Sequence, residues 1–266
     1  MAVDRAVKLG SNTFQIFTRN PRQWHSTKLS PESAKIFSDK VDMHNIKHVF
    51  AHMPYLPNLA SPKEEIYTKS VRTLTSELER CMQLKIFYLV THLGSHLGEG
   101  MQIGFIRIIN GINQALSNTR GTVMLLLENT AGTKNSMGGT FEDIQHIIEN
   151  LNNPERVGVC FDTSHAFAAG YDLRTEKNVE ETIRRIDESF GFEKLKLVHL
   201  NDSKGNLNSG IDRHDHIGLG KIGDEGFRNV LASRFGTLPL IMETPKDSRR
   251  SDVGNLEKIK ELMVGL

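Results

Sequence analysis

The chain is poor in cysteine. It has two, Cys81 and Cys160, which lie far apart and lack CxxC spacing. This excludes a disulfide-stabilised scaffold and a zinc site built from thiolates, and it fits a reducing cytosol. The chain also has no apolar run of the ~18 residues that a membrane span needs, and its N-terminus has no signal-peptide pattern. These absences predict a cytoplasmic protein that has no membrane partner.

The chain also has nearly equal numbers of positive and negative residues. The formal net charge is +1, whereas a dedicated nucleic-acid coat protein would be far more basic. Any binding to nucleic acid must therefore come from a local patch or from bound metals. The sequence also lacks linkers and low-complexity tracts, so we expect one domain that spans residues 1–266.

Short runs rich in β-branched and aromatic residues recur along the chain, and each is followed by a polar loop and an amphipathic stretch. The starts of successive runs are 34 to 43 residues apart. Apolar runs at such a near-constant period indicate a repeated βα unit whose parallel strands are buried on both faces. The predicted strands are residues 13–18, 48–52, 86–91, 123–128, 157–162, 196–200 and 239–243, and helices are predicted at residues 1–10, 62–84, 141–151 and 179–190.

This pattern predicts an α/β fold, a TIM (β/α)8 barrel. The sequence shows seven strands where such a barrel has eight, and it begins with a helix. A seven-stranded sheet would leave the first and last predicted strands as unpaired edges, which are a liability in solution. We therefore hypothesise that the first strand of the barrel is missing from the N-terminus of this chain, either because the chain starts inside the natural coding region or because it has been shortened.

The predicted strands end in residues that bind metals. Barrel enzymes place their catalytic residues at the C-terminal ends of the strands and in the loops that follow. Those positions hold His52, His92, Glu128, Asp162, His199 and Glu243, and the loops add His165, Asp212 and His214. One zinc ion usually takes four ligands, so these nine residues predict a cluster of two or three ions with a bridging carboxylate. His96 and His216 lie close to them in the sequence and are candidates for supporting the ligands.

The chain resembles the endonuclease IV family of apurinic/apyrimidinic endonucleases over essentially its whole length. The matching segments are Phe17–Trp24, His52–Leu56, His92–His96, Leu127–Thr130, Val159–Gly170, His199–Lys204, Asp212–His214 and Gly218–Gly223. The resemblance implies a TIM barrel with three zinc ions that cleaves duplex DNA 5′ to an abasic site and leaves a 3′-hydroxyl and a 5′-deoxyribose phosphate. The family begins with a strand that carries a Gly-x-His-x-Ser element, and the absence of this element here agrees with a missing first strand.

The resemblance also assigns roles to the predicted ligands. One zinc would be held by His52, His92 and Glu128. Glu128 would be the catalytic carboxylate that bridges to a second zinc, which Asp162, His199 and Glu243 would also hold. The third zinc would take His165, Asp212 and His214. A zinc-bound hydroxide would attack the phosphorus directly, because paired metals stabilise the charge on both the attacking and the leaving oxygen. Manganese or iron could replace zinc at such ligands.

Recognition of DNA would come from other residues. By the same resemblance, Arg22, Tyr55 and Leu56 would form a wedge that enters the duplex at the lesion, where unstacking costs less because a base is already missing. Core packing is the favoured interpretation for Trp24. Phosphate contacts are expected from loop residues at the same end of the barrel, with solvated surface charge as the alternative: Arg19, Lys134, Lys204, Arg213 and Lys221. The expected partner is double-stranded DNA with abasic sites, bound by a monomer in a prokaryotic-type cytoplasm at the nucleoid.

Two other functions stay open at this point. A sugar isomerase or epimerase of the xylose isomerase-like barrels would share the architecture, but it would have fewer histidine ligands, one or two metals and no wedge. A metal-bound protein that binds damaged DNA without cleaving it would have little need for a bridging carboxylate such as Glu128.

Overall fold

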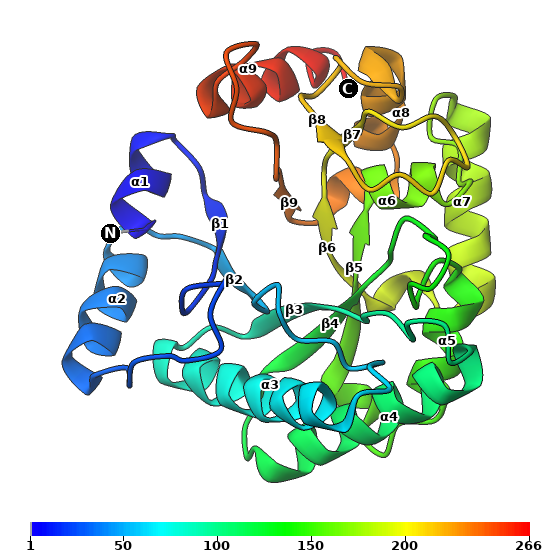
Figure 1. The fold of residues 1–266 in the computed structure, drawn as a ribbon. Helices are drawn as coiled ribbons and strands as arrows, with labels where there is room; N and C mark the ends of the chain where they lie inside the picture. Colours follow the sequence, from blue (N-terminus) through cyan, green and yellow to red (C-terminus); the bar gives the residue numbers. More distant parts are fainter. Residues whose placement is uncertain (1) are drawn as a thin grey trace. The chain divides into compact units, whose positions relative to one another are not determined.

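The computed structural model describes residues 2–266, and Met1, the first residue of the predicted N-terminal helix, lies outside the described residues. Strands and helices alternate along the chain (Figure 1). The chain packs into two compact units, one of residues up to Leu127 together with Ile147–Gly158, the other of Glu128–His146 together with Val159–Leu266. Among residues 2–266, no helix has the length and apolar character needed to cross a membrane.

The strands of the first unit pair in parallel. β1 (Thr13–Ile16) pairs with β2 (His48–His52), which pairs with β3 (Tyr88–His92). Parallel neighbours need a long crossover connection, usually a helix, and the chain supplies one between each pair. The helices are α1 (Ala2–Lys8), α2 (Pro31–Met43), α3 (Glu64–Leu84), α4 (Met101–Asn118) and a short 3-10 helix at Pro154–Arg156; β4 (Met124–Glu128) ends at the boundary of the unit.

The strands of the second unit are parallel as well. β5 (Val157–Asp162), which belongs to this unit from Val159 on, pairs with β6 (Leu195–His199), which pairs with β9 (Leu240–Ile241), and Asp162 lies opposite His199. A small antiparallel hairpin follows β6, in which β7 (Asp202–Ser203) pairs with β8 (His214–Asp215) (Figure 1). The helices are α5 (Phe141–Glu149), which belongs to this unit as far as His146, α6 (Thr163–Ala168), α7 (Glu176–Ser189), α8 (Gly223–Ala232), α9 (Asp252–Leu262) and 3-10 helices at Phe192–Lys194 and Arg234–Thr237.

The observed strands confirm the predicted period. The seven strands stand in the order β1-β2-β3-β4-β5-β6-β9, which is the order of the predicted runs along the chain. Every residue of β5 is buried, and so are the last four residues of β4, as expected for strands covered on both faces. The predicted strand at 239–243 is shorter in the structure, where only Leu240 and Ile241 form ladder bonds. The eighth strand before residue 1 stays a prediction.

A buried ion pair fixes the loop after β1 to α3. The carboxylate of Glu77, in α3, is fully buried; its Oε1 accepts from Nε of Arg19 and its Oε2 accepts from the Thr18 hydroxyl at 2.7 Å. The same hydroxyl accepts from Nε of Arg80 at 2.8 Å, and Arg80 also donates to the backbone oxygen of Thr27 at 3.0 Å. Because this network spans residues 18 to 27, it holds the segment that contains Arg22.

Replacing Glu77 by alanine should therefore destabilise the fold. The change leaves the buried Arg19 guanidinium without its carboxylate partner, and breaking a buried pair in this way costs ~3–5 kcal/mol. The measurement is the free energy of unfolding in urea. Glu65→Ala on the same helix is the control, since Glu65 pairs with Lys69 at 2.7 Å on the surface and should leave the midpoint nearly unchanged. Equal midpoints for both variants would show that the pair does not stabilise the fold.

Candidate metal centre

The structure places the predicted ligands at the C-terminal ends of their strands. His52, His92, Glu128, Asp162 and His199 are the last residues of β2, β3, β4, β5 and β6. Glu243 follows the end of β9 by two residues, His165 lies in α6, His214 opens β8, and Asp212 precedes it. These residues thus stand at or near strand ends, as the period of the strands predicted, and barrel enzymes place their catalytic residues at such ends.

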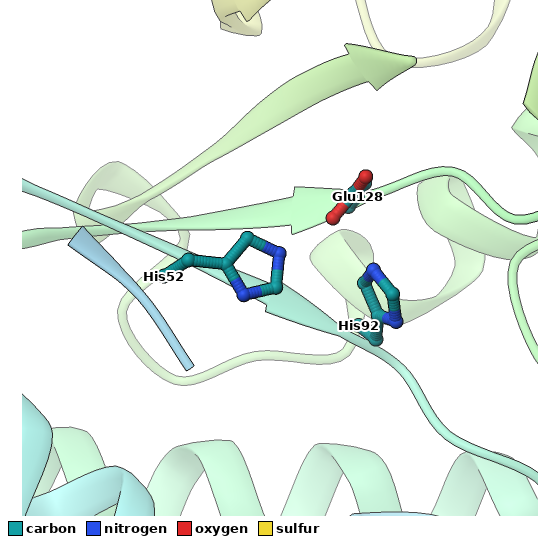
Figure 2. Close-up of side chains that lie close together, drawn as sticks. All are labelled: His52, His92 and Glu128. Carbon is teal, nitrogen blue, oxygen red and sulfur yellow. The ribbon is translucent and has the colours of Figure 1, made fainter. Parts of the chain in front are cut away.

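Three groups of these side chains could each hold a metal ion. They are His52, His92 and Glu128 (Figure 2); Glu128, Asp162, His199 and Glu243; and Asp162, His165 and His214. Within each group the potential ligand atoms lie within 4.8 Å of one another. Glu128 belongs to the first and second groups and Asp162 to the second and third, so two carboxylates are shared. Shared carboxylates are suited to bridging neighbouring ions.

In the second group, three carboxylates surround a single imidazole nitrogen. Nδ1 of His199 lies 3.0 Å from Oε1 of Glu128, 3.2 Å from Oε2 of Glu243 and 3.9 Å from Oδ2 of Asp162. The side chains of His199, Glu128 and Asp162 are fully buried. Carboxylates that share a buried site disfavour each other's ionisation unless a cation compensates them. This donor set therefore fits a divalent cation.

In the third group, two imidazole nitrogens face each other. Nε2 of His165 lies 3.4 Å from Nε2 of His214, and the latter lies 3.6 Å from Oδ2 of Asp162. Asp212 joins them from the solvent side, with Oδ1 at 3.1 Å from Nε2 of His165 and a half-exposed side chain. Nitrogen and oxygen donors thus converge from β5, α6 and the hairpin, and this group contains Asp162 where the predicted third set has Asp212.

The imidazoles are oriented by backbone carbonyls. Nδ1 of His52 lies 2.7 Å from the oxygen of Met53, Nδ1 of His165 lies 2.9 Å from that of Asn129, and Nδ1 of His214 lies 3.2 Å from that of Glu243. A carbonyl oxygen can only accept, so each Nδ1 must carry the proton and donate. Nε2 is then the nitrogen that offers a lone pair to a metal, the arrangement usual for histidine ligands.

Two asparagines fix the carboxylates. Asn201 donates from Nδ2 to Oδ2 of Asp162 at 2.7 Å, and its Oδ1 accepts from the backbone N–H of Glu243 at 2.7 Å. Asn129 binds the backbone of Asp162 from the other side, donating to its oxygen at 3.1 Å and accepting from its N–H at 2.7 Å. Oδ1 of Asp162 also caps α6 by accepting from the N–H of His165 at 2.8 Å. Asp162 is thereby held from three neighbouring segments.

These asparagines escaped the sequence interpretation. Each follows a predicted ligand directly or by two positions, in Glu128-Asn129 and His199-Leu200-Asn201, and both are buried. The sequence does show an asparagine close after a predicted ligand in both cases. It does not show that these asparagines are buried, because the period of the strands gives no information about burial in the loops.

The negative charge of the site governs the protonation of its histidines. Burial alone would lower the pKa of His165, but the charges of Asp162 and Glu128 and the hydrogen bond with Asp212 raise it to about 10. Burial would likewise lower the pKa of His199, but the charges of Glu243 and Glu128 raise it above the ordinary value. Burial raises the pKa of the Cys160 thiol to about 12, so this cysteine offers no thiolate. The donors are imidazoles and carboxylates, which fit zinc and also manganese or iron.

The sequence matches the family described as the xylose isomerase-like TIM barrel over residues 3–263. It is 54% identical to a protein named probable endonuclease 4 from Methanoculleus marisnigri, in an alignment that covers 98% of this chain and 93% of that protein. A probable endonuclease 4 from Nitrosopumilus maritimus is 48% identical, with 98% and 94% covered. The chain belongs to the endonuclease IV family.

The fold agrees with this membership. The crystal structure of endonuclease IV from Thermus thermophilus is similar with a TM-score of 0.88 at 33% identity, and the match covers 100% of this chain and 94% of that chain. The fold is therefore TIM-barrel-like, as predicted. A D-tagatose 3-epimerase-like protein is also similar, with a TM-score of 0.74, but at 19% identity this likeness concerns the fold alone.

The predicted wedge residues of this endonuclease IV homologue lie on the surface of the first unit. Tyr55 is 60% exposed and Leu56 is 38% exposed. The Tyr55 ring packs edge-on against Phe17, with centroids 5.1 Å apart, and its backbone N–H donates to the oxygen of Pro21 at 3.0 Å. The loop of exposed Arg22 is thereby joined to the loop of Tyr55. A cleft of about 240 Å3, lined by His52, Met53, Pro54, Tyr55, Leu56, Pro57, Asn58, Leu59, Thr91, His92, Gly94 and Ser95, opens beside them.

One predicted phosphate contact is wrong. Arg19 has a side chain that is 5% exposed and is paired with the buried Glu77, so its charge is directed into the protein. The sequence could not show this, because the partner lies 58 residues away. The other basic residues of that prediction are exposed: Lys134, Lys204, Arg213 and Lys221.

The two supporting candidates bind loops instead of the predicted ligands. Nδ1 of His96 accepts from the backbone N–H groups of Gly98 at 3.2 Å and Gly100 at 3.0 Å. His216 is fully buried, with Nε2 at 2.9 Å from Oδ1 of Asp247 and Nδ1 at 2.9 Å from Nδ2 of Asn255. In the part of the chain that the structure describes, both rings thus organise loops around the site.

Zinc binding to the metal-free protein should release protons. His165, with its pKa near 10, is protonated at pH 7.5, and the raised pKa of His199 favours its protonated form; each must lose that proton to act as a ligand, so at least one proton should leave. Calorimetric titration at pH 7.5 in buffers of different ionisation enthalpy counts them. Metal affinity should accordingly fall as the pH is lowered. A heat of binding that is the same in every buffer would contradict the assigned protonation.

Proposed function

We propose that the chain hydrolyses the phosphodiester bond 5′ to an abasic site in double-stranded DNA, leaving a 3′-hydroxyl and a 5′-deoxyribose phosphate. The observation that carries the proposal is the set of three ligand groups linked by Glu128 and Asp162 in a member of the endonuclease IV family. A single-metal isomerase site would have no use for two shared carboxylates. We expect the protein to act as a monomer in the cytoplasm of a prokaryote, where its DNA substrate lies.

The ligand groups account for the chemistry. When bound, zinc would supply Lewis acidity toward the phosphate oxygens and a nucleophilic water at neutral pH. The protein's contribution is to hold the donors in place. Glu128 and His199 form the buried centre, Asn201 keeps Asp162 and Glu243 in register, and the half-exposed Asp212 leaves the third group accessible from solvent. A phosphodiester can therefore approach the centre from the side of the hairpin loop.

Recognition of the lesion is proposed for the exposed residues beside the cleft. Tyr55 and Leu56 offer an aromatic and an apolar surface next to His52, and Arg22 offers a positive charge from the adjoining loop. Inserting such side chains into a duplex requires unstacking, which costs least where a base is absent. Selectivity for abasic sites would follow from this difference in cost.

The decisive experiment is cleavage of a duplex that contains one abasic-site analogue, combined with metal analysis of the same sample. Incision 5′ to the lesion, abolished by a strong chelator, and about three metals per chain are expected. Full metal with binding but no incision would favour a damaged-DNA binder. About one metal, no incision and turnover of a ketose would favour a sugar epimerase.

Replacing Glu128 by glutamine should abolish cleavage. The amide keeps the shape of the side chain but loses the charge that two ligand groups share, so the rate should fall more than about 100-fold. Glu142→Gln, an exposed glutamate paired with Arg185 on the surface, is the control and should cleave at the normal rate. A normal rate for Glu128→Gln would overturn the assignment of the shared ligand.

Replacing Tyr55 by alanine should reduce selectivity and leave the metals in place. Loss of one stacking side chain is expected to lower the preference for abasic over intact duplex about tenfold or more, as measured by competition binding. Phe87→Ala is the matched control, because Phe87 is an aromatic residue of similar exposure just before the start of β3, at the opposite end of the strand from His92. The same loss in both variants would exclude a specific role for Tyr55.

A further inference from the structure

The glycine-rich segment Gly218–Gly223 wraps around a carboxylate of the protein itself. Glycine-rich loops often present backbone N–H groups to a phosphate. Here five N–H groups are already occupied by Asp202, which opens β7. Its Oδ1 accepts from Ser203 at 2.8 Å and Ile222 at 2.9 Å, and its Oδ2 accepts from Gly218 and Gly220 at 2.9 Å and from Gly223 at 3.3 Å.

Glycine is required for this wrapping. A Cβ at Gly220 would lie 2.4 Å from the backbone oxygen of Ser203 and 2.5 Å from Oδ1 of Asp202, both closer than real contacts allow. Gly218 and Gly223 have φ values of +77° and +73°, in the region that side chains disfavour. The segment is thus shaped to enclose the Asp202 carboxylate, which is completely buried.

The enclosed carboxylate sits at the base of the ligand-bearing hairpin. Asp202 lies opposite Asp215 in the β7–β8 pairing, and Ser203 lies opposite His214. The backbone N–H of Lys221 donates to the oxygen of Ser203 at 2.8 Å, which ties the glycine segment to the same strand. The loop between β7 and β8 therefore begins and ends in a strand pair that is anchored by the buried Asp202 carboxylate.

We propose that Asp202 is a positioning residue that holds His214 and Asp212 against His165 and thereby retains the metal of the third group. This inference rests on the proposed function for its use in catalysis. The physical basis is the strength of hydrogen bonds from N–H groups to an ionised acceptor. Burial raises the pKa of the Asp202 carboxyl, and the N–H groups of Gly220, Ile222, Ser203 and Gly223 act against that shift. The carboxylate and the loop depend on each other.

The first test replaces Asp202 by asparagine, which has the same shape but lacks the charge and directs an NH2 group at N–H donors. Metal content after gel filtration should fall from about three to about two per chain. Trypsin cleavage after the exposed Lys204 and Arg213 should become at least about tenfold faster, because the loop opens locally. Asp224→Asn, a nearby surface aspartate paired with Lys258 at 2.7 Å, is the control and should change neither.

The second test restores the missing anion. In Asp202→Ala, added formate should occupy the five N–H groups and return both the third metal and the resistance to trypsin, whereas uncharged formamide should not. If Asp202→Asn fails to fold, refolding of Asp202→Ala in formate against formamide decides the question, since equal yields would contradict the proposal.

Other outcomes overturn the proposal directly. Asp202→Asn that retains about three metals and the trypsin resistance of Asp224→Asn would show that the enclosure does not position the ligands. Loss of all metals together from a folded Asp202→Asn would show a general structural role. Metal content and proteolysis do not require DNA, so these results stand apart from a failure of the wild-type protein to cleave abasic duplex.

Discussion

The structure depends on how it compensates buried negative charge at the ends of its strands. Glu128 and Asp162 are fully buried, and burial of uncompensated carboxylates is among the costliest arrangements in a folded chain. The imidazoles of His165 and His199 lie against them, and the negative charges raise the pKa values of both rings, which favours their protonated forms. A cation in place of those protons satisfies the same electrostatic demand. The same buried carboxylates therefore determine both what stabilises this end of the strands and which ions can bind there.

The uncharged neighbours of the ligands set the geometry. Backbone carbonyls fix the tautomers of three histidines, and the amides of Asn129 and Asn201 hold Asp162 from two sides. Asn201 also reaches the backbone of Glu243, so one side chain couples the last residue of β5 to a residue that follows β9. Ligands held this firmly lose little conformational entropy when an ion binds. Substitutions of these asparagines are therefore expected to lower metal affinity.

The sequence predicted the strands well, and the residue types that could bind metals stand at their ends, because both follow from short-range patterns. Apolar runs at a constant period mark the strands, and His52, His92, Glu128, Asp162 and His199 stand where those runs stop. Its failures concern contacts between distant segments. The burial of Arg19 against Glu77 and the enclosure of Asp202 by Gly218–Gly223 depend on partners that no local pattern specifies. The β7–β8 hairpin was missed because strands of two residues have no periodicity.

The two buried cysteines have a consequence for the behaviour of the protein under oxidative conditions. Reaction with peroxide requires the thiolate form. Burial keeps the thiols of Cys81 and Cys160 protonated, with raised pKa values, and shields them from solvent. Cys160 lies beside His199, so a sulfenic acid there would disturb the ligand. A chain that keeps this sulfur inert can continue to work while oxidants are damaging the DNA around it.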